Sequence, residues 1–126
     1  MNFSQDTSEE STFIHSYTAD YLVINKTKYD CHCLLHRDGM IKPWTPDTPL
    51  QPASSEFDEI LQLNPEVVLF GTGQQLHFPS NELRRFFNQQ SIGLEIMDTG
   101  AACRTYNILL SEGRNVAAAI LLDRAF

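Results

Sequence analysis

Two loops that contain glycine hold the residues best suited, by type and spacing, to form a binding site. Gly71-Thr72-Gly73-Gln74 follows the apolar residues 67–70, and Asp98-Thr99-Gly100 follows residues 94–97. Each loop leads into a predicted helix, whose free N–H groups and positive dipole end favour an anion. Arg104, in the first turns of the second helix, could add a guanidinium. The candidate ligand-binding residues are Gly71, Thr72, Gly73, Gln74, Asp98, Thr99, Gly100, Arg104, Thr105 and Asn107.

The same loops have a structural interpretation. Gly71 and Gly73 could serve only for a tight exit from a strand, and Arg104 could pair with Asp98. Neither loop matches a known phosphate-binding motif, because a dinucleotide fingerprint needs glycine where this chain has Leu76, and Gly-Lys-Ser/Thr is absent. The sequence therefore predicts a cleft at the strand ends without naming its ligand.

Cysteine chemistry has less support. Cys103 lies near a predicted helix N-terminus beside Arg104, and both conditions lower a thiol pKa. A nucleophile also needs a base, and His77 is the best placed of the four histidines. The alternative is a small buried thiol that packs a helix against the sheet. No Gly-x-Ser-x-Gly or His-Glu-x-x-His pattern occurs, so a non-enzymatic role is favoured over catalysis.

A metal site is not expected in Cys31-His32-Cys33-Leu34-Leu35-His36. In an extended strand the two cysteines face one side and the two histidines face the other. The chain is therefore predicted to hold no metal or other cofactor. An odd cysteine count without a secretory signal favours reduced thiols and a cytoplasmic location.

The elements that must position these residues follow from hydrophobic periodicity and turn residues. The third predicted helix, capped by Asp98 or Thr99 and ended by Gly113, places Ala102 and Tyr106 on its apolar stripe. The proline-rich residues 43–52 form a connector, and the lone Trp44 is expected to close the core rather than anchor a partner. Short helices are predicted after Ser54 or Ser55 and after Pro79-Ser80, and strands over residues 13–17, 21–25, 29–36, 40–44, 67–70, 94–97 and 116–122.

Length and composition indicate one soluble globular domain, and the order of the predicted helices and strands indicates an α/β domain over residues 12–126. The 126 residues carry 9 Lys and Arg against 16 Asp and Glu, a net charge of -7, and the scattered basic residues argue against a nucleic-acid surface. The longest apolar run, residues 116–122, is too short to cross a membrane. Residues 1–11 are polar and acidic, and we predict a disordered lead there. The alternation of helices and strands in the second half predicts a mostly parallel sheet flanked by helices, and the first half predicts a β-rich front end.

Several segments resemble the small Mth-type domain family of unknown function, which includes bacterial and archaeal single-domain proteins, the adipogenesis-associated Mth-type protein and the third assembly factor of mitochondrial respiratory complex I. The resemblance covers about residues 13 to 122, but Cys31, Cys33 and His36 lie outside the family pattern. The segments that carry it are Val68-Leu69-Phe70-Gly71-Thr72-Gly73, Phe78-Pro79, Met97-Asp98-Thr99-Gly100-Ala101-Ala102-Cys103-Arg104-Thr105-Tyr106-Asn107-Ile108-Leu109 and Glu112-Gly113-Arg114-Asn115-Val116-Ala117-Ala118-Ala119.

The resemblance implies a three-layer α/β fold with a central mixed, mostly parallel sheet and extra N-terminal strands. It implies no established enzyme activity. Its mitochondrial members imply help in the assembly of a membrane complex through protein–protein contact. Two hypotheses follow for this chain. The first is a non-catalytic accessory protein that has protein partners. The second is a small-molecule or anion-binding module with its cleft between Gly71-Thr72-Gly73-Gln74 and the loop from Asp98 to Arg104.

Overall fold

Five strands form the central sheet, and the second half of the chain supplies its middle. In the computed structural model, which describes residues 11–126, the strand order is β5-β4-β8-β6-β7. β6 lies parallel to β7 and β8, whereas β4 lies antiparallel to β5 and β8. The elements are β1 (Ile14–Tyr17), β2 (Leu22–Ile24), β3 (Thr27–Tyr29), β4 (Cys33–His36), β5 (Ile41–Pro43), η1 (Ser54–Phe57), α2 (Asp58–Leu61), β6 (Val67–Thr72), α3 (Asn81–Gln89), β7 (Gly93–Met97), α4 (Thr99–Ser111), β8 (Val116–Leu121) and η2 (Asp123–Ala125).

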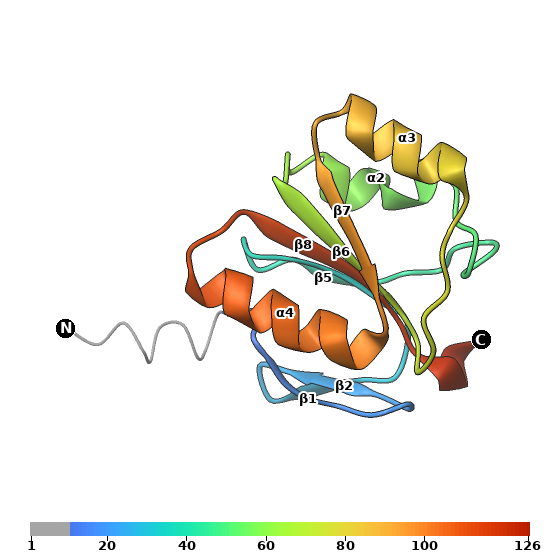
Figure 1. Cartoon of the computed structure of the whole chain (residues 1–126). Coiled ribbons are helices and arrows are strands. Elements are labelled where there is room, and N and C mark those ends of the chain that lie inside the picture. Colours follow the sequence, from blue (N-terminus) through green and yellow to red (C-terminus); the bar gives the residue numbers. More distant parts are fainter. Residues whose placement is uncertain (1–10) are drawn as a thin grey trace.

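The two faces of this sheet carry two separate cores. Every residue of β6 and β8 is buried, as is usual for central strands covered on both sides. Helix α4 packs on one face through Ala102, Cys103 and Tyr106. Phe57 of η1 and Phe87 of α3 lie in the core of the other face. Figure 1 shows α4 on one side of the strands and α2 and α3 on the other. The expected α/β class with a mixed sheet is confirmed, and two of the four strand pairings are parallel.

The extra N-terminal strands form a separate three-stranded antiparallel sheet, β1-β2-β3. The prediction of one strand over residues 29–36 was wrong. Tyr29 ends β3 in register with Leu22 of β2, and the chain begins a new strand at Cys33. The cause is a hairpin at Asn25 and Lys26, which adopt positive φ angles of 52° and 69°. This turn returns the chain along β2 before it enters the central sheet.

Helix starts were predicted correctly where a side chain caps them. Ser80 Oγ accepts the Leu83 N–H at 3.2 Å, and Asp98 Oδ1 accepts the Ala101 N–H at 2.9 Å. The predicted serine cap before residue 57 was wrong, because Ala53 occupies the N-cap position of η1 and no side chain bonds there. Backbone geometry alone starts that short element.

Trp44 closes the core, as expected, and is 4% exposed. Its ring centroid lies 5.3 Å from that of Phe57 and 6.0 Å from that of Phe70. The indole Nε1–H donates to Glu56 O at 2.8 Å, so the polar end of this large side chain is satisfied inside the protein. The connector predicted over residues 43–52 begins one residue later than expected, at Trp44, because Pro43 still belongs to β5.

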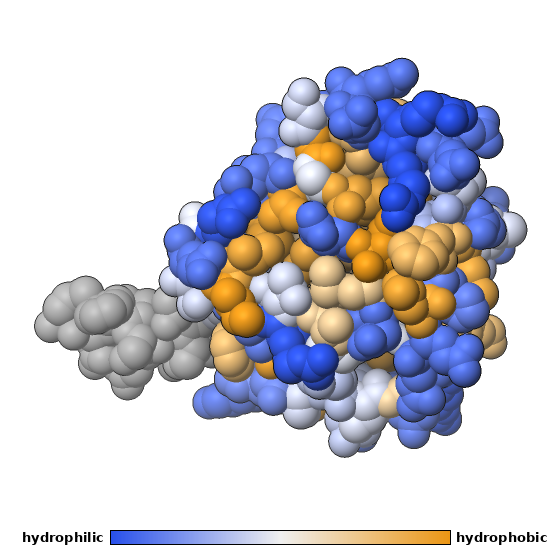
Figure 2. Space-filling view, in the orientation of Figure 1, coloured by the Kyte–Doolittle hydropathy of each residue, from blue (hydrophilic) through white to orange (hydrophobic). Residues whose placement is uncertain are grey.

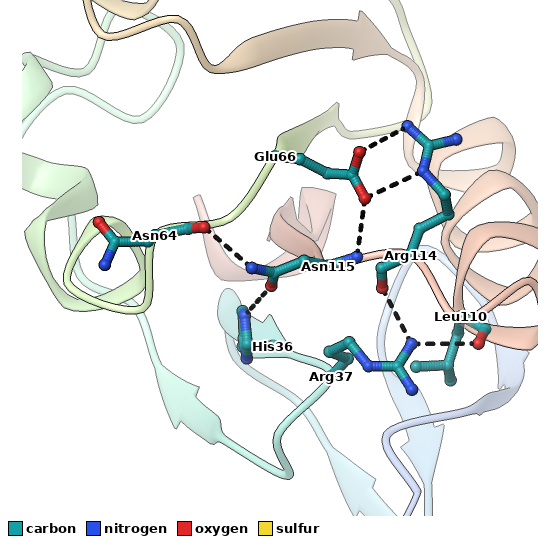
Figure 3. A network of polar contacts seen from close by, with 7 residues as sticks. All are labelled: His36, Arg37, Asn64, Glu66, Leu110, Arg114 and Asn115. Atoms are coloured by element: carbon teal, nitrogen blue, oxygen red, sulfur yellow. Dashed lines mark hydrogen bonds and ion pairs between the residues drawn. The ribbon is translucent and has the colours of Figure 1, made fainter.

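A polar network joins the end of β4 to the loops before β6 and β8 (Figure 3). Asn115 lies at its centre: Oδ1 accepts from His36 Nε2 at 2.6 Å, and Nδ2 donates to Asn64 O at 2.9 Å. The Glu66 carboxylate accepts the backbone N–H of Asn115 at 3.0 Å and two bonds from Arg114 at 3.0 and 3.1 Å. The network holds the strand starts together, at the end of β6 and β8 opposite the predicted cleft.

Candidate functional site

A cavity of about 270 Å³ lies where β6 and β8 end and α4 begins. The turn between β1 and β2 also contributes to its wall. Six of the ten sequence-predicted site residues line it. They are Gly73, Gln74, Asp98, Thr99, Gly100 and Arg104.

Thr99 holds the floor of this cavity together. Its backbone N–H donates to Gly73 O at 2.7 Å, and its hydroxyl accepts the Gly73 N–H at 2.9 Å. The same hydroxyl donates to Leu121 O at 2.7 Å. Thr99 is 5% exposed, so these three bonds join the ends of β6 and β8 to the start of α4 in a buried setting. Its polar groups are therefore used within the protein.

Close contacts leave little room for a side chain at two of the predicted site glycines, Gly73 and Gly100. Gly73 has φ +94°, and a Cβ there would collide with the carboxylate of Asp123. That carboxylate accepts the Gln74 N–H at 3.1 Å. A Cβ on Gly100 would lie 3.0 Å from the ring of Tyr17. A side chain at either position would thus push into a wall of the cavity.

Charges of both signs line the cavity. The Asp98 carboxylate caps α4, and therefore already occupies part of the positive helix end. The Arg104 guanidinium donates a hydrogen bond to the Tyr17 hydroxyl. With Asp123 as a second carboxylate, the cavity has two acidic side chains and one basic one. This lining suits a small polar molecule that can both donate and accept hydrogen bonds.

The other four predicted residues lie outside the cavity lining. Gly71 and Thr72 belong to β6 rather than to a loop, so the predicted end of that strand was two residues too early. Thr72 Oγ1 donates to Gln75 O at 2.7 Å and shapes the turn that follows. Asn107 binds the backbone of Ile14. Thr105 is half-buried on α4.

Sequence reasoning missed the residues that distant segments contribute. The cavity is lined by Tyr17 at the end of β1 and by Thr18 and Ala19 of the following turn, as well as by Asp123 after β8. The Arg124 N–H donates to Ala19 O at 3.3 Å and joins η2 to the β1–β2 turn at this point. No motif marks these positions, because they meet only after folding.

Two of the cysteines, Cys33 and Cys103, are buried thiols. Burial raises the pKa of Cys103 to about 12, although Arg104 acts in the opposite direction. Burial also raises the pKa of Cys33 far above its usual range, and neighbouring Cys31 and Cys103 add to that shift. Cys103 therefore stays protonated at neutral pH, which favours its packing role over the reactive one.

A second hollow, about 550 Å³, lies near the starts of β6 and β7. Asp58 of α2, Glu66 before β6 and Phe86 of α3 are among its lining residues. The Glu66 carboxylate there already binds Arg114. None of the predicted site residues reaches this hollow.

The chain is similar to proteins of known sequence along almost its full length. A family model described as a protein of unknown function (DUF498/DUF598) matches residues 14–121. The 13 kDa major membrane protein of Francisella tularensis is 26% identical over 96% of this chain and 99% of that protein. NADH dehydrogenase (ubiquinone) 1 alpha subcomplex assembly factor 3 of Xenopus tropicalis is 28% identical over 90% of this chain and 63% of that protein. The chain thus spans less than two thirds of that assembly factor.

Solved structures show the same fold. The NMR structure of a Xanthomonas campestris protein matches with TM-score 0.81 and 32% identity over 98% of this chain and 93% of that one. A Bordetella pertussis protein described as a Mth938-like domain matches with TM-score 0.77 and 28% identity over 93% of this chain and 88% of that one. The expected resemblance to the Mth-type family is confirmed.

Proposed function

This chain belongs to the DUF498/DUF598 family of proteins of unknown function, and from that membership we propose that it is a non-catalytic accessory protein that acts through contacts with other proteins. One observation carries the proposal. The similarity to an assembly factor of NADH dehydrogenase spans 90% of this chain. The shared part is therefore the whole α/β domain, and an assembly role located in that domain would extend to this protein.

We place the protein in the cytoplasm, where it would meet its partners before or during their assembly. None of the helices in residues 11–126 has the length and hydropathy needed to cross a bilayer. A relative is named as a major membrane protein, so contact with a membrane-bound partner is the alternative arrangement. Fractionation of its own cells distinguishes the two: release by salt wash indicates binding to a membrane protein, and recovery without any wash indicates a cytoplasmic pool.

The proposed function is tested by crosslinking in living cells followed by affinity purification of the tagged chain. A discrete set of proteins should be recovered in fixed ratio, and an unrelated acidic protein of similar size and expression should not recover it. Recovery of the bare chain under conditions that preserve known complexes would contradict an accessory role.

A second candidate function rests on the cavity at the strand ends, where six predicted residues meet. It is a binding site for a small polar or anionic molecule. Native mass spectrometry of the gently purified protein should show a retained small mass that Arg104→Ala removes without unfolding the domain. Tyr17→Phe is the matched variant, because it keeps the ring but removes the hydroxyl that Arg104 contacts. If Arg104→Ala unfolds the protein, Arg104 has a structural role and this candidate loses its main support.

A further inference from the structure

The two edges of the central sheet differ in how they are protected. β5 has three residues, ends at Pro43, and carries Lys42, whose Nζ donates to Glu59 at 2.8 Å. Proline and lysine are typical of edges that do not accept another strand. β7 has five residues without proline or lysine and pairs only with β6 in the part of the chain that the structure describes. β7 is the open edge.

The backbone of β7 offers hydrogen-bonding groups at this edge. The Gly93 N–H donates to Glu66 O at 3.0 Å, and the parallel register continues through Met97. In a parallel pair alternate residues direct both backbone groups to the same neighbour. The backbone N–H and C=O groups of Gly93, Glu95 and Met97 therefore point toward β6. Those of Leu94 and Ile96 point outward, away from the sheet. An added strand would satisfy these four groups.

Apolar side chains surround the open edge. Figure 1 shows β7 in front of the other strands, between α4 and α3, and Figure 2 shows apolar surface over the same region in the same orientation. Contiguous exposed apolar surface of this kind marks interaction sites. Phe86 of α3 and Ile92, just before β7, are half-buried and pack against the same core as Leu94 and Ile96. Leu94, Ile96 and Met97 of β7 itself are half-buried.

The charge of this edge selects the kind of partner. Glu95 is the only charged side chain of β7, it is exposed, and it forms no ion pair with residues 11–126. Since side chains alternate along a strand, Glu95 lies on the sheet face opposite Leu94 and Ile96. In a second copy of this chain, antiparallel pairing centred on β7 would set Glu95 against Glu95, and both copies carry a net charge of -7. Like charges opposite each other destabilise a strand pair.

We propose that β7 binds an extended segment of a different protein as a sixth strand, in which apolar residues alternate with a Lys or Arg that pairs with Glu95. This rests on the proposed function, because it names the surface through which the accessory protein would contact its partner. The backbone groups of Leu94 and Ile96 would provide affinity, and Glu95 together with the apolar surface would provide specificity.

Two synthetic peptides test this proposal on the full chain: acetyl-Thr-Val-Lys-Val-Lys-Val-Thr-amide and the same sequence with glutamate in place of lysine. Amide NMR spectra are recorded during each titration. The lysine peptide should shift the resonances of β7 and slow hydrogen exchange at the Leu94 and Ile96 amides. The glutamate peptide should bind about tenfold more weakly, because it sets like charges against Glu95.

Reversing the charge at residue 95 tests whether Glu95 itself selects the peptide. Glu95→Lys should weaken binding of the lysine peptide by about tenfold and should strengthen binding of the glutamate peptide. Asp20→Lys, at an exposed turn between β1 and β2, makes the same change in net charge away from β7 and should leave the preference for lysine unchanged. Equal binding of both peptides to the unaltered protein, or shifts that map outside β7, would overturn the proposal. So would a dimer of the free protein that Glu95→Gln stabilises, because this change removes the like charges that would meet between two copies.

Failure of the β7 proposal can be distinguished from failure of the proposed accessory function. A cellular partner that Glu95→Lys retains in full would reject β7 as the contact surface and leave the accessory role intact. Absence of any cellular partner would reject the accessory role even if the peptides bind.

Discussion

The side chain of Asn107 binds both backbone polar groups of Ile14. Its Oδ1 accepts the Ile14 N–H at 2.8 Å, and its Nδ2 donates to Ile14 O at 2.9 Å. These residues are 93 positions apart in the sequence. The pair of bonds fastens β1, and with it the small N-terminal sheet, to α4.

Asn107→Ala should lower the free energy of unfolding by about 1–3 kcal/mol, because it leaves a partly buried N–H and C=O without partners. Urea unfolding measures the loss, and hydrogen exchange should accelerate in β1 and β2 before other strands. Ser111→Ala on the exposed end of the same helix is the control and should change stability by less than about 0.5 kcal/mol. Equal effects of the two variants would show that Asn107 does not fasten β1.

Gly73→Ala should destabilise the protein more than Gly113→Ala. Both glycines have positive φ, +94° and +76°, so each substitution adds backbone strain of about 1 kcal/mol. At Gly73 the new methyl group would also displace the Asp123 carboxylate, whereas a Cβ on Gly113 meets no atom within 4 Å. Thermal unfolding of the two variants measures the difference, and equal melting temperatures would contradict the predicted contact with Asp123.

Glu66 should make stability depend on acidic pH. Its hydrogen bonds from Arg114 and from the Asn115 backbone hold the pKa of this carboxyl below its usual value. A lowered carboxyl pKa contributes stability above the unfolded-state pKa of roughly 4.3, and this contribution disappears as pH falls through the folded-state pKa. The stability difference between the unaltered protein and Glu66→Gln should therefore be present at neutral pH and vanish in acid. A difference that grows as the pH falls would contradict this sign.

Thiol labelling should distinguish the three cysteines. Cys33 and Cys103 are 0% and 1% exposed, whereas Cys31 is half-buried. In the folded protein, a disulfide reagent such as dithionitrobenzoate should react first at Cys31, and the other two thiols should react only on unfolding. Cys31→Ser should remove the fast phase. If Cys103→Ser removes it instead, the thiol of Cys103 is reactive after all.

Local signals in the sequence predicted most of the central fold. The caps at Ser80 and Asp98 were found because a capping side chain bonds within its own turn. The hairpin at Asn25 and Lys26 was missed because no glycine marks its positive φ angles. Strands that continue through glycine, as β6 does through Gly71, also end later than a polar boundary suggests.

Local sequence signals predicted only part of the candidate site. Parallel neighbours place their carboxyl ends together, and this rule was enough to bring Gly73 and Thr99 into contact. The sequence did not distinguish Asn107 as a ligand donor from Asn107 as the partner of Ile14, because that choice depends on where β1 lies. Tyr17 and Asp123 were missed for the same reason.

The most direct test of the accessory role is quantitative purification of the crosslinked chain from its own cells, with Glu95→Lys and Asp20→Lys measured beside the unaltered protein. We predict that the unaltered chain and Asp20→Lys recover the same partner protein in fixed ratio, and that Glu95→Lys recovers severalfold less of it. Recovery of no partner by any of the three chains would contradict the central claim that this protein acts through contacts with other proteins.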